Sequence, residues 1–212
     1  MRLLWLAAAS LLLAGPQQSD YLKPPYGPAN PLLSPDRAYS LIGSYEDSQL
    51  FIEDNHTHQR RLVMGITVQT MTLAWAPDSS AFIVNDRPVS NFETAYIYDV
   101  KTLHGLDLRR RIAEADSRAI PFLDGQITLD DSAPQINLPS GKNADHQFVH
   151  ADRWLDKHHV QVELTGHTDS VMVHDRIDPS DCFVFRYRIS LTGVVEKLSR
   201  QVYPVPRHGC RE

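Results

Sequence analysis

Histidine is the residue type with the clearest capacity for chemistry in this chain, with ten among 212 residues. His56 and His58 would share one face of a strand, and His146 and His150 are spaced for one side of a helical turn. The other candidate ligands are His158, His159, His167 and His174. Zinc needs three or four ligands in one place, which spacing alone does not show. Because the chain has no Cys-x-x-Cys spacing, we predict no metal and no cofactor.

A second candidate chemistry is hydrolysis at a site made of histidine and aspartate. His146, His150, Asp152 and His159 cluster around Trp154, in segments that we expect to be loops. A histidine with a carboxylate beside it is a common general-base arrangement. The motifs G-x-S-x-G, H-E-x-x-H and G-x-G-x-x-G are absent from the sequence. We therefore predict a non-enzymatic protein without catalytic residues, and a hydrolase is the alternative.

Two further motifs are less informative. Asp175, Asp178 and Asp181 are spaced by three residues, whereas a calcium loop places its acids at every second position around a glycine. We expect an ordinary turn before the next strand. The segment Asn55-His56-Thr57 matches the N-glycosylation pattern, which matters only in a eukaryotic secretory pathway.

The first nineteen residues have the pattern of an export signal. Arg2 provides the positive start, residues 3–14 are apolar apart from Ser10, and Pro16 ends the run. The run is shorter than the about 20 residues of a membrane span, so we predict a signal peptide over 1–19 and no membrane insertion after its removal. The protein is then periplasmic or secreted. There Cys182 and Cys210 are expected to form a disulfide, the alternative being two unpaired thiols.

The charge balance limits the class of partner. The chain carries a formal net charge of −5, and phosphate binding needs a concentrated basic face. We therefore predict no nucleic-acid partner. Residues 20–33 are rich in proline, which fixes φ and removes backbone donors, so we expect an extended leader there.

A repeated turn indicates the elements that must position these residues. Ser34-Pro35-Asp36 precedes an apolar stretch at 39–42, and Ala76-Pro77-Asp78 precedes one at 81–84. The 42 residues from Pro35 to Pro77 fall within the roughly 40–45-residue period of a four-stranded propeller blade. A degenerate third copy without the proline starts at Trp154. We predict a single β-rich domain over 34–212, with blade-like units near 34–64, 75–102 and 154–203.

The segment after the second unit has helical periodicity. Asp107 is a good N-cap candidate, and the apolar side chains Leu108, Ile112 and Ala115 form one stripe. The basic run 109–111 should point mostly away from that stripe, into solvent. Short strands are also predicted at 126–129 and 135–138.

The last predicted element is a hairpin. Aromatic and apolar residues alternate with polar ones from Phe183 to Ile189, Thr192-Gly193 supplies a turn, and 194–203 returns. The predicted fold class is therefore mainly β. It consists of blade-like antiparallel sheets, as an incomplete propeller or a curved sheet stack, with one short amphipathic helix.

The turns and the strands that follow them resemble the TolB-type propeller repeat, in which a W-S-P-D-G turn precedes a strand and the next strand ends in a polar turn. The resemblance covers about 33–102, and Trp75, Pro77, Asp78 and Asp99 match it. The motif's glycine is replaced, by Arg37 in one copy and Ser79 in the other. Two or three units are too few for a ring of 4–8 blades, so the resemblance implies stacked or curved blades.

The same resemblance implies an interaction platform in the bacterial envelope, and it brings no catalytic residues to this sequence. We therefore expect an exported, non-enzymatic binding or scaffold protein whose partner is another envelope or secreted protein. A periplasmic inhibitor or immunity protein is a variant of this interpretation, and the hydrolase is its rival. The oligomeric state stays open, although open blades leave strand edges that need cover.

Overall fold

The computed structural model describes residues 30–44, 48–66, 70–90, 92–123, 144–168, 171–173, 176–178, 181–205 and 210. The predicted signal peptide, most of the leader and the strands predicted at 126–129 and 135–138 lie outside these residues. Within them the predicted fold class is confirmed, because antiparallel strands dominate and a single short α-helix is present. None of the helices in these ranges is long and apolar enough to cross a membrane.

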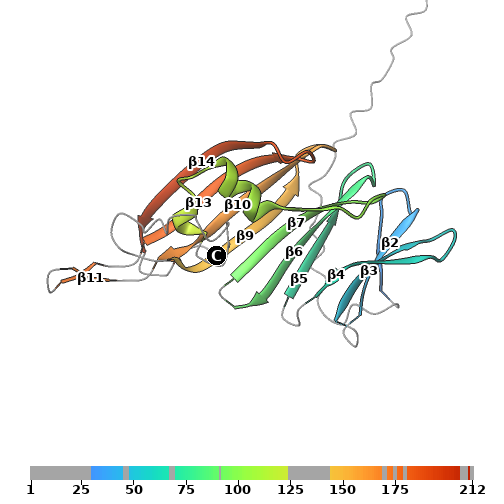
Figure 1. Cartoon of the computed structure of the whole chain (residues 1–212), viewed down its shortest axis with the longest axis horizontal. Coiled ribbons are helices and arrows are strands. Elements are labelled where there is room, and N and C mark those ends of the chain that lie inside the picture. Colours follow the sequence, from blue (N-terminus) through green and yellow to red (C-terminus); the bar gives the residue numbers. More distant parts are fainter. Residues whose placement is uncertain are drawn as a thin grey trace, which may run out of the picture.

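The first unit is a four-stranded antiparallel sheet at one end of the molecule (Figure 1). Its strands, in spatial order, are β1 (Leu32–Leu33), β2 (Tyr39–Ser44), β3 (Gln49–Asp54) and β4 (Arg60–Gly65). Alternation along β3 buries Leu50 and Ile52 on one side of the sheet. That side faces the second unit.

The second unit repeats this order, with a longer central pair of strands. It contains β5 (Thr70–Trp75), β6 (Ala81–Val89), β7 (Phe92–Asp99) and the short β8 (Gly105–Asp107). The side chains of Phe82, Val84 and Tyr98 pack with Leu50 and Ile52 in one buried cluster. The two sheets therefore stack face to face, as neighbouring blades do.

Polar contacts fasten the first unit to the second. The Arg61 guanidinium donates to the backbone oxygens of Val100 at 2.6 Å and Lys101 at 2.8 Å. The Trp75 indole Nε1 donates to the Leu32 oxygen at 3.1 Å. These bonds tie β4 to the turn after β7, and β1 to the end of β5.

The third unit lies at the opposite end and carries the predicted hairpin, which is confirmed (Figure 1). Its strands are β9 (Ala144–Trp154), β10 (His159–Thr168), β13 (Asp181–Ser190) and β14 (Val195–Pro204). A separate two-stranded ribbon, β11 (Val171–Val173) with β12 (Arg176–Asp178), extends between β10 and β13.

Strand β9 joins the third unit to the second. It pairs in parallel with β7 only at Phe92 and Glu93, which makes the continuous order β14-β13-β10-β9-β7-β6-β5. Beyond that point the Asn85 side chain of β6 accepts from Ala151 N at 2.8 Å and donates to Ala151 O at 3.1 Å. The Trp154 Nε1 reaches the Ala74 oxygen on β5 at 3.3 Å. The end of β9 therefore crosses over β6 and β5, on the face away from the first unit.

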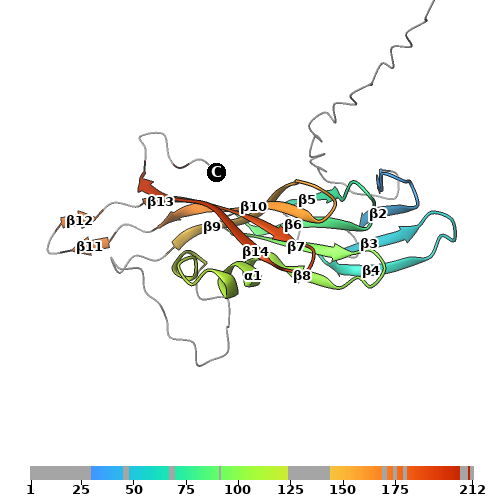
Figure 2. The same ribbon diagram turned by 90° about the horizontal axis from the view of Figure 1, so that it is seen from above.

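A large apolar cluster fills the space between the second and third units. It includes Ile83 and Ile97 from the second unit and Val162, Leu164 and Phe185 from the third. The predicted helix is confirmed as α1 (Leu108–Ala115), with Asp107 as N-cap accepting from Arg110 N at 3.1 Å. It buries Leu108, Ile112 and Ala113 in this cluster. Figure 2 shows α1 alongside β8 and β14.

Two parts of the helix prediction were wrong. Ala115, which its spacing placed in the apolar stripe, is exposed, and Ala113 is buried instead. Arg109 does not point into solvent, since only 3% of it is exposed. Its guanidinium lies 4.5 Å from the centre of the Phe92 ring and donates to the backbone oxygen of Leu123 and to the Gln147 side chain. The buried face of the helix is therefore wider than its apolar stripe. The segment that follows the helix, with η1 (Ile120–Phe122), and strand β9 cover the side where Arg109 lies.

The repeated turns have the same local geometry. Arg37 and Ser79 both adopt a left-handed φ of 61°, at the position where the TolB-type motif has glycine. In each turn the aspartate before them accepts a backbone bond, from Ala38 N at 3.0 Å and from Ser80 N at 3.1 Å. The sequence repeat is thus a structural repeat. In both copies the hydrogen bond of the aspartate holds the next residue in a left-handed conformation, which glycine would adopt without strain.

The third unit has a disulfide on β13 and a bulge on its outer strand β14. The disulfide predicted between Cys182 and Cys210 is confirmed and ties the C-terminal tail to β13. Strand β14 is the outer strand of the large sheet, and its register shifts opposite Arg186 and Tyr187, which pair with Ser199 and Lys197. Leu198 is the extra residue of this bulge.

Candidate functional site

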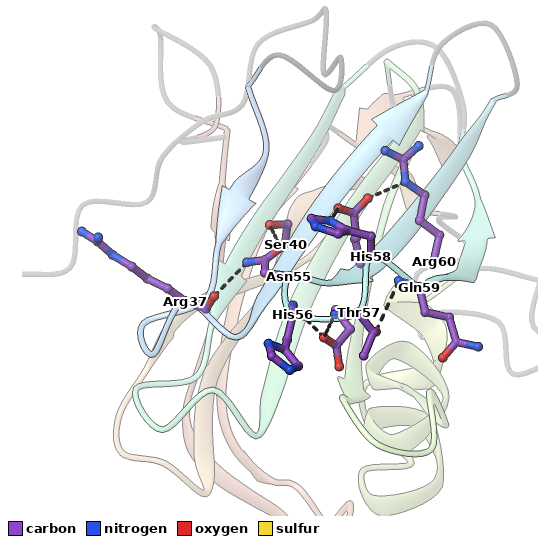
Figure 3. A network of polar contacts seen from close by, with 10 residues as sticks. Arg37, Ser40, Asn55, His56, Thr57, His58, Gln59 and Arg60 are labelled. Carbon is purple, nitrogen blue, oxygen red and sulfur yellow. Dashed lines mark hydrogen bonds and ion pairs between the residues drawn. The ribbon is translucent and has the colours of Figure 1, made fainter.

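The turn after β3 holds the first pair of candidate histidines (Figure 3). His56 and His58 do not share a strand face, because the chain turns at Asp54, whose Oδ1 accepts from the backbone nitrogens of His56 and Thr57, each at 2.9 Å. The His58 ring contacts Glu53 at 3.3 Å and is 79% exposed. The pair therefore lies in the connection between β3 and β4, where the Asp54 carboxylate closes a turn that ends the strand.

The same turn engages the asparagine of the glycosylation pattern. The Asn55 Oδ1 accepts from the Ser40 hydroxyl at 2.6 Å, and its Nδ2 donates to the Arg37 oxygen at 2.8 Å (Figure 3). The two polar atoms of this side chain thus tie the β3–β4 turn to the β1–β2 turn at Arg37 and to strand β2 at Ser40. The geometry fits a structural role for Asn55.

The second group of candidates shares one surface, which we call the third-unit face. It is the side of β9, β10 and β13 that points away from the apolar cluster. Along β10 every second residue is buried and the intervening ones are half-exposed. The polar side chains of the face are His146, His150, Gln161, Glu163, Thr165, His167, Arg186 and Arg188.

The centre of the third-unit face is a row of charged residues. His150, Glu163 and Arg186 are neighbours in register across β9, β10 and β13. The Arg186 Nε lies 2.6 Å from Glu163 Oε1, and the His150 Nδ1 lies 2.5 Å from Glu93 Oε1. Burial lowers the pKa of His150, but the hydrogen bond and charge of Glu93 outweigh it, so the pKa is raised overall.

A second polar row runs beside the first. The Gln161 amide donates to Asp152 and accepts from Arg153, both at 3.1 Å. At the far side Arg188 Nε lies 3.1 Å from Glu196 Oε2. Each of these cations has an anion or amide oxygen beside it, so the face carries no concentrated charge of either sign.

One end of the third-unit face holds an imidazole pair. His146 and His167 are direct cross-strand neighbours, and their rings stack with centres 4.1 Å apart. Phe148 lies next to them on β9 and has the Arg87 guanidinium 4.5 Å from its ring centre. No group of three or more His, Cys, Asp or Glu side chains within the described ranges is placed to hold a metal ion.

The residues of the hydrolase hypothesis are only partly brought together. His146, His150 and Asp152 lie on β9 and not in loops, and His159 begins β10, with its ring 2.9 Å from Asp156 instead. The helical turn indicated by the spacing of His146 and His150 was wrong, because both residues lie on strand β9. They still share one face, since residues four apart in a strand point to the same side. Among the described contacts of His150, none is with a hydroxyl or a thiol. The pair with Glu93 can hold a proton.

Sequence reasoning missed the partners of these histidines. Glu93 lies 57 residues before His150, and only the parallel pairing of β7 with β9 brings the two together. The alternation His-Val-Gln-Val-Glu-Leu-Thr in 159–165 does signal one polar face for β10. The register that places Arg186 beside Glu163 could not be read from either strand alone.

Comparison with known proteins gives little further guidance. No family model matches the sequence, and no curated protein is similar to it. Among solved structures, the chain is similar to TolB from Acinetobacter baumannii, at 13% identity over 80% of this chain and 31% of that one, with a TM-score of 0.36. It is also similar to the core factor of S. cerevisiae, at 9% identity over 85% and 24%, with a TM-score of 0.34. The chain spans less than a third of either protein, and at these scores the likeness carries no conclusion about fold or function.

Proposed function

We propose that this chain is an exported, non-enzymatic binding or scaffold protein of the bacterial envelope. The observation that carries the proposal is the third-unit face, a broad and half-exposed sheet surface whose charges are already paired. Its partner is another envelope or secreted protein, because such a surface offers many hydrogen bonds at fixed spacing to a complementary polar surface. In the same proposal, the three units are TolB-type blades, which the shared turn geometry at Arg37 and Ser79 supports.

The charge arrangement favours a protein partner over a nucleic acid. Arg186 and Arg188 each lie within 3.1 Å of a carboxylate oxygen, and the chain as a whole carries a net charge of −5. A phosphate backbone would find no concentrated basic strip there.

Export is supported by two independent observations. The Cys182–Cys210 disulfide is of a kind that persists in oxidising compartments. The first nineteen residues have the composition of a secretory signal. Fractionation of cells that express the full chain tests this point, and recovery of the uncleaved chain in the cytoplasm would contradict it.

The binding proposal is tested by reversing an ion pair without breaking it. The double variant Glu163→Arg with Arg186→Glu keeps a salt bridge within the sheet but inverts the pattern that the face presents. A photo-crosslinking residue at Thr165 first identifies the partner, and purified proteins then give its affinity. We expect the reversed pair to weaken binding at least about tenfold, since like charges now meet across the interface.

The matched control reverses the exposed pair Arg110–Glu114 of α1, whose atoms lie 2.8 Å apart on another surface. This variant should bind as the wild type does. Equal binding by both double variants, or the absence of any crosslinked partner in an envelope extract, would contradict the proposal.

A hydrolase remains the alternative, and the His150–Glu93 contact is the observation in its favour. A protein that hydrolyses a substrate through this pair must lose activity in His150→Ala. An inhibitor or immunity protein would instead lower the activity of its purified, crosslinked partner. These two outcomes separate the alternatives from one another.

A further inference from the structure

Two imidazole rings lie against each other at one end of the third-unit face. His146 and His167 are direct partners in the register of β9 with β10, and their ring centres are 4.1 Å apart with 28° between the ring planes. Both residues are half-buried, so solvent reaches the pair. His150 and His159 instead have carboxylates as their partners. The fold therefore brings two potential nitrogen ligands together on neighbouring strands.

The backbone is irregular on both sides of this pair. Gly166 has a φ of 153°, and a Cβ at this position would collide with the backbone oxygen of His146. Only glycine lets β9 approach β10 this closely. On the other side the register shifts between His167 and Thr168, which pair with His146 and Ala144. Such bulges re-aim side chains and are frequent beside functional sites.

A hydrogen bond determines which nitrogen of one ring carries the proton. The His167 Nδ1 lies 3.4 Å from the backbone oxygen of Thr168. Because a carbonyl oxygen only accepts, Nδ1 is the donor, and the other nitrogen, Nε2, carries a lone pair. Metal-binding histidines have this arrangement, in which one ring nitrogen donates to a backbone oxygen or a carboxylate and the other binds the ion.

We propose that His146 and His167 form a two-imidazole site for a divalent transition-metal ion, with water in the remaining coordination positions. Imidazole suits zinc, nickel and copper, and of these copper(II) binds a given set of ligands most tightly. With metal–nitrogen bonds of about 2.0–2.1 Å, two nitrogens bound side by side lie about 3 Å apart. The stacked rings reach that separation by tilting toward each other about χ2, a torsion with a broad minimum.

The proposed site differs from the metal-free protein that the sequence predicted, because the pair arises from the register of two strands. It offers two ligands, fewer than the three or four of a closed zinc site, so the ion exchanges with solvent. The sheet holds both imidazoles in place, and the second nitrogen therefore binds intramolecularly, which makes the pair a tighter ligand than either histidine alone. The Arg87 guanidinium, 4.5 Å from the centre of the neighbouring Phe148 ring, opposes a further positive charge and lowers this affinity.

Addition of copper(II) to the mature, disulfide-bonded chain tests the location of the site. The ion is paramagnetic and broadens the amide signals nearest to it in the spectrum of the ¹⁵N-labelled protein. Free glycine in the buffer competes for the ion and keeps it from single histidines. Below one equivalent of copper, the amides of 146–148 and 165–167 should disappear first. If these amides stay sharp while those near other histidines or the N-terminus broaden, the proposal is overturned.

Calorimetry of the same titration measures the contribution of each ligand. His167→Gln and His146→Gln each remove one nitrogen ligand, and each should raise the dissociation constant for copper(II) at least about tenfold. The matched control is His58→Gln, because the His58 ring is 79% exposed and lies beside Glu53 in another unit. This control should bind copper as the wild type does.

Thermal unfolding without metal must show that all three variants fold as the wild type does. Equal dissociation constants in the wild type and in His167→Gln would overturn the proposal, and so would an equal loss in His58→Gln. The titration uses the chain alone, so its result is independent of the binding proposal. A chain that binds its partner but no copper would contradict only the metal site.

Discussion

Replacement of Asn85 by alanine should weaken the attachment of the third unit to the second. Asn85 is 5% exposed, and its side-chain amide bonds both backbone groups of Ala151 as a neighbouring strand would. Its Nδ2 also lies 3.0 Å from the Thr72 hydroxyl. No other described bond joins β6 to β9 at this place, so the substitution leaves the N–H and C=O of Ala151 without their partner.

The magnitude follows from these two orphaned groups. Ala151 is itself only 3% exposed, so water does not readily replace the lost bonds. A buried polar group left without a partner costs about 1–3 kcal/mol, which gives roughly 2–6 kcal/mol for the pair. A typical domain has a free energy of unfolding of about 5–15 kcal/mol. The loss is therefore a large part of the total.

Two measurements check this reasoning. Urea unfolding followed by tryptophan fluorescence gives the change in the free energy of unfolding, since Trp75 and Trp154 lie at the ends of β5 and β9. Hydrogen exchange of the Ala151 amide reports the local opening, and its protection should fall more than that of β3 in the first unit.

The matched control is Asn55→Ala. Asn55 also bonds two partners across a turn, but it is partly exposed and water can replace it, so the loss should stay below about 1 kcal/mol. If Asn85→Ala costs no more than Asn55→Ala, or leaves exchange at Ala151 unchanged, the Asn85 amide does not hold the third unit in place.

Three further outcomes are expected. Arg37→Gly should raise the free energy of unfolding by up to about 1 kcal/mol in urea titration, because glycine adopts the φ of 61° without strain; a loss of stability would refute a strained turn. Reduction of Cys182–Cys210, which are 28 residues apart, should lower the free energy of unfolding by roughly 3–4 kcal/mol, and unchanged unfolding in reductant would show that the tail adds nothing. Because folding raises the pKa of His150, its protonation adds to the free energy of unfolding. The whole contribution is present below the pKa of the unfolded chain, about 6.5, and it is lost as the pH rises through the pKa of the folded protein. Glu93→Gln should flatten that pH dependence, as thermal unfolding from pH 5 to 8 would show, and an unaltered slope would exclude the His150–Glu93 pair as its source.

Local elements of the fold were predictable because neighbouring residues determine them. The turn at Ala76-Pro77-Asp78, the N-cap at Asp107 and the alternation in 183–189 each act within a few residues, and each indicated the right structure. The burial of Arg109 was not predictable, because its partners come from Leu123 and Gln147, on other segments of the chain.

The candidate site was predictable only in its residue types. Histidines at 146, 150 and 167 were recognised as candidates. A spacing of four residues, however, places two side chains on one face in a strand as well as in a helix, so it does not distinguish the two. Which of them meet depends on the register of β9 with β10, and Glu93 arrives through the parallel contact of β9 with β7. Such long-range pairings carry no signature in either strand by itself.

The bulge at Leu198 bears on how the molecule behaves at high concentration. An outer strand of ten residues, such as β14, is a template on which other chains can add strands and grow into fibres. The extra residue bends this strand midway, and Lys197 beside it is drawn inward to Asp116 at 2.8 Å. A strand from another chain could form regular hydrogen bonds along only half of β14, because the bulge shifts the register of the donors and acceptors beyond it. Deleting Leu198 would remove the bulge and leave a regular edge strand, on which aggregation could start.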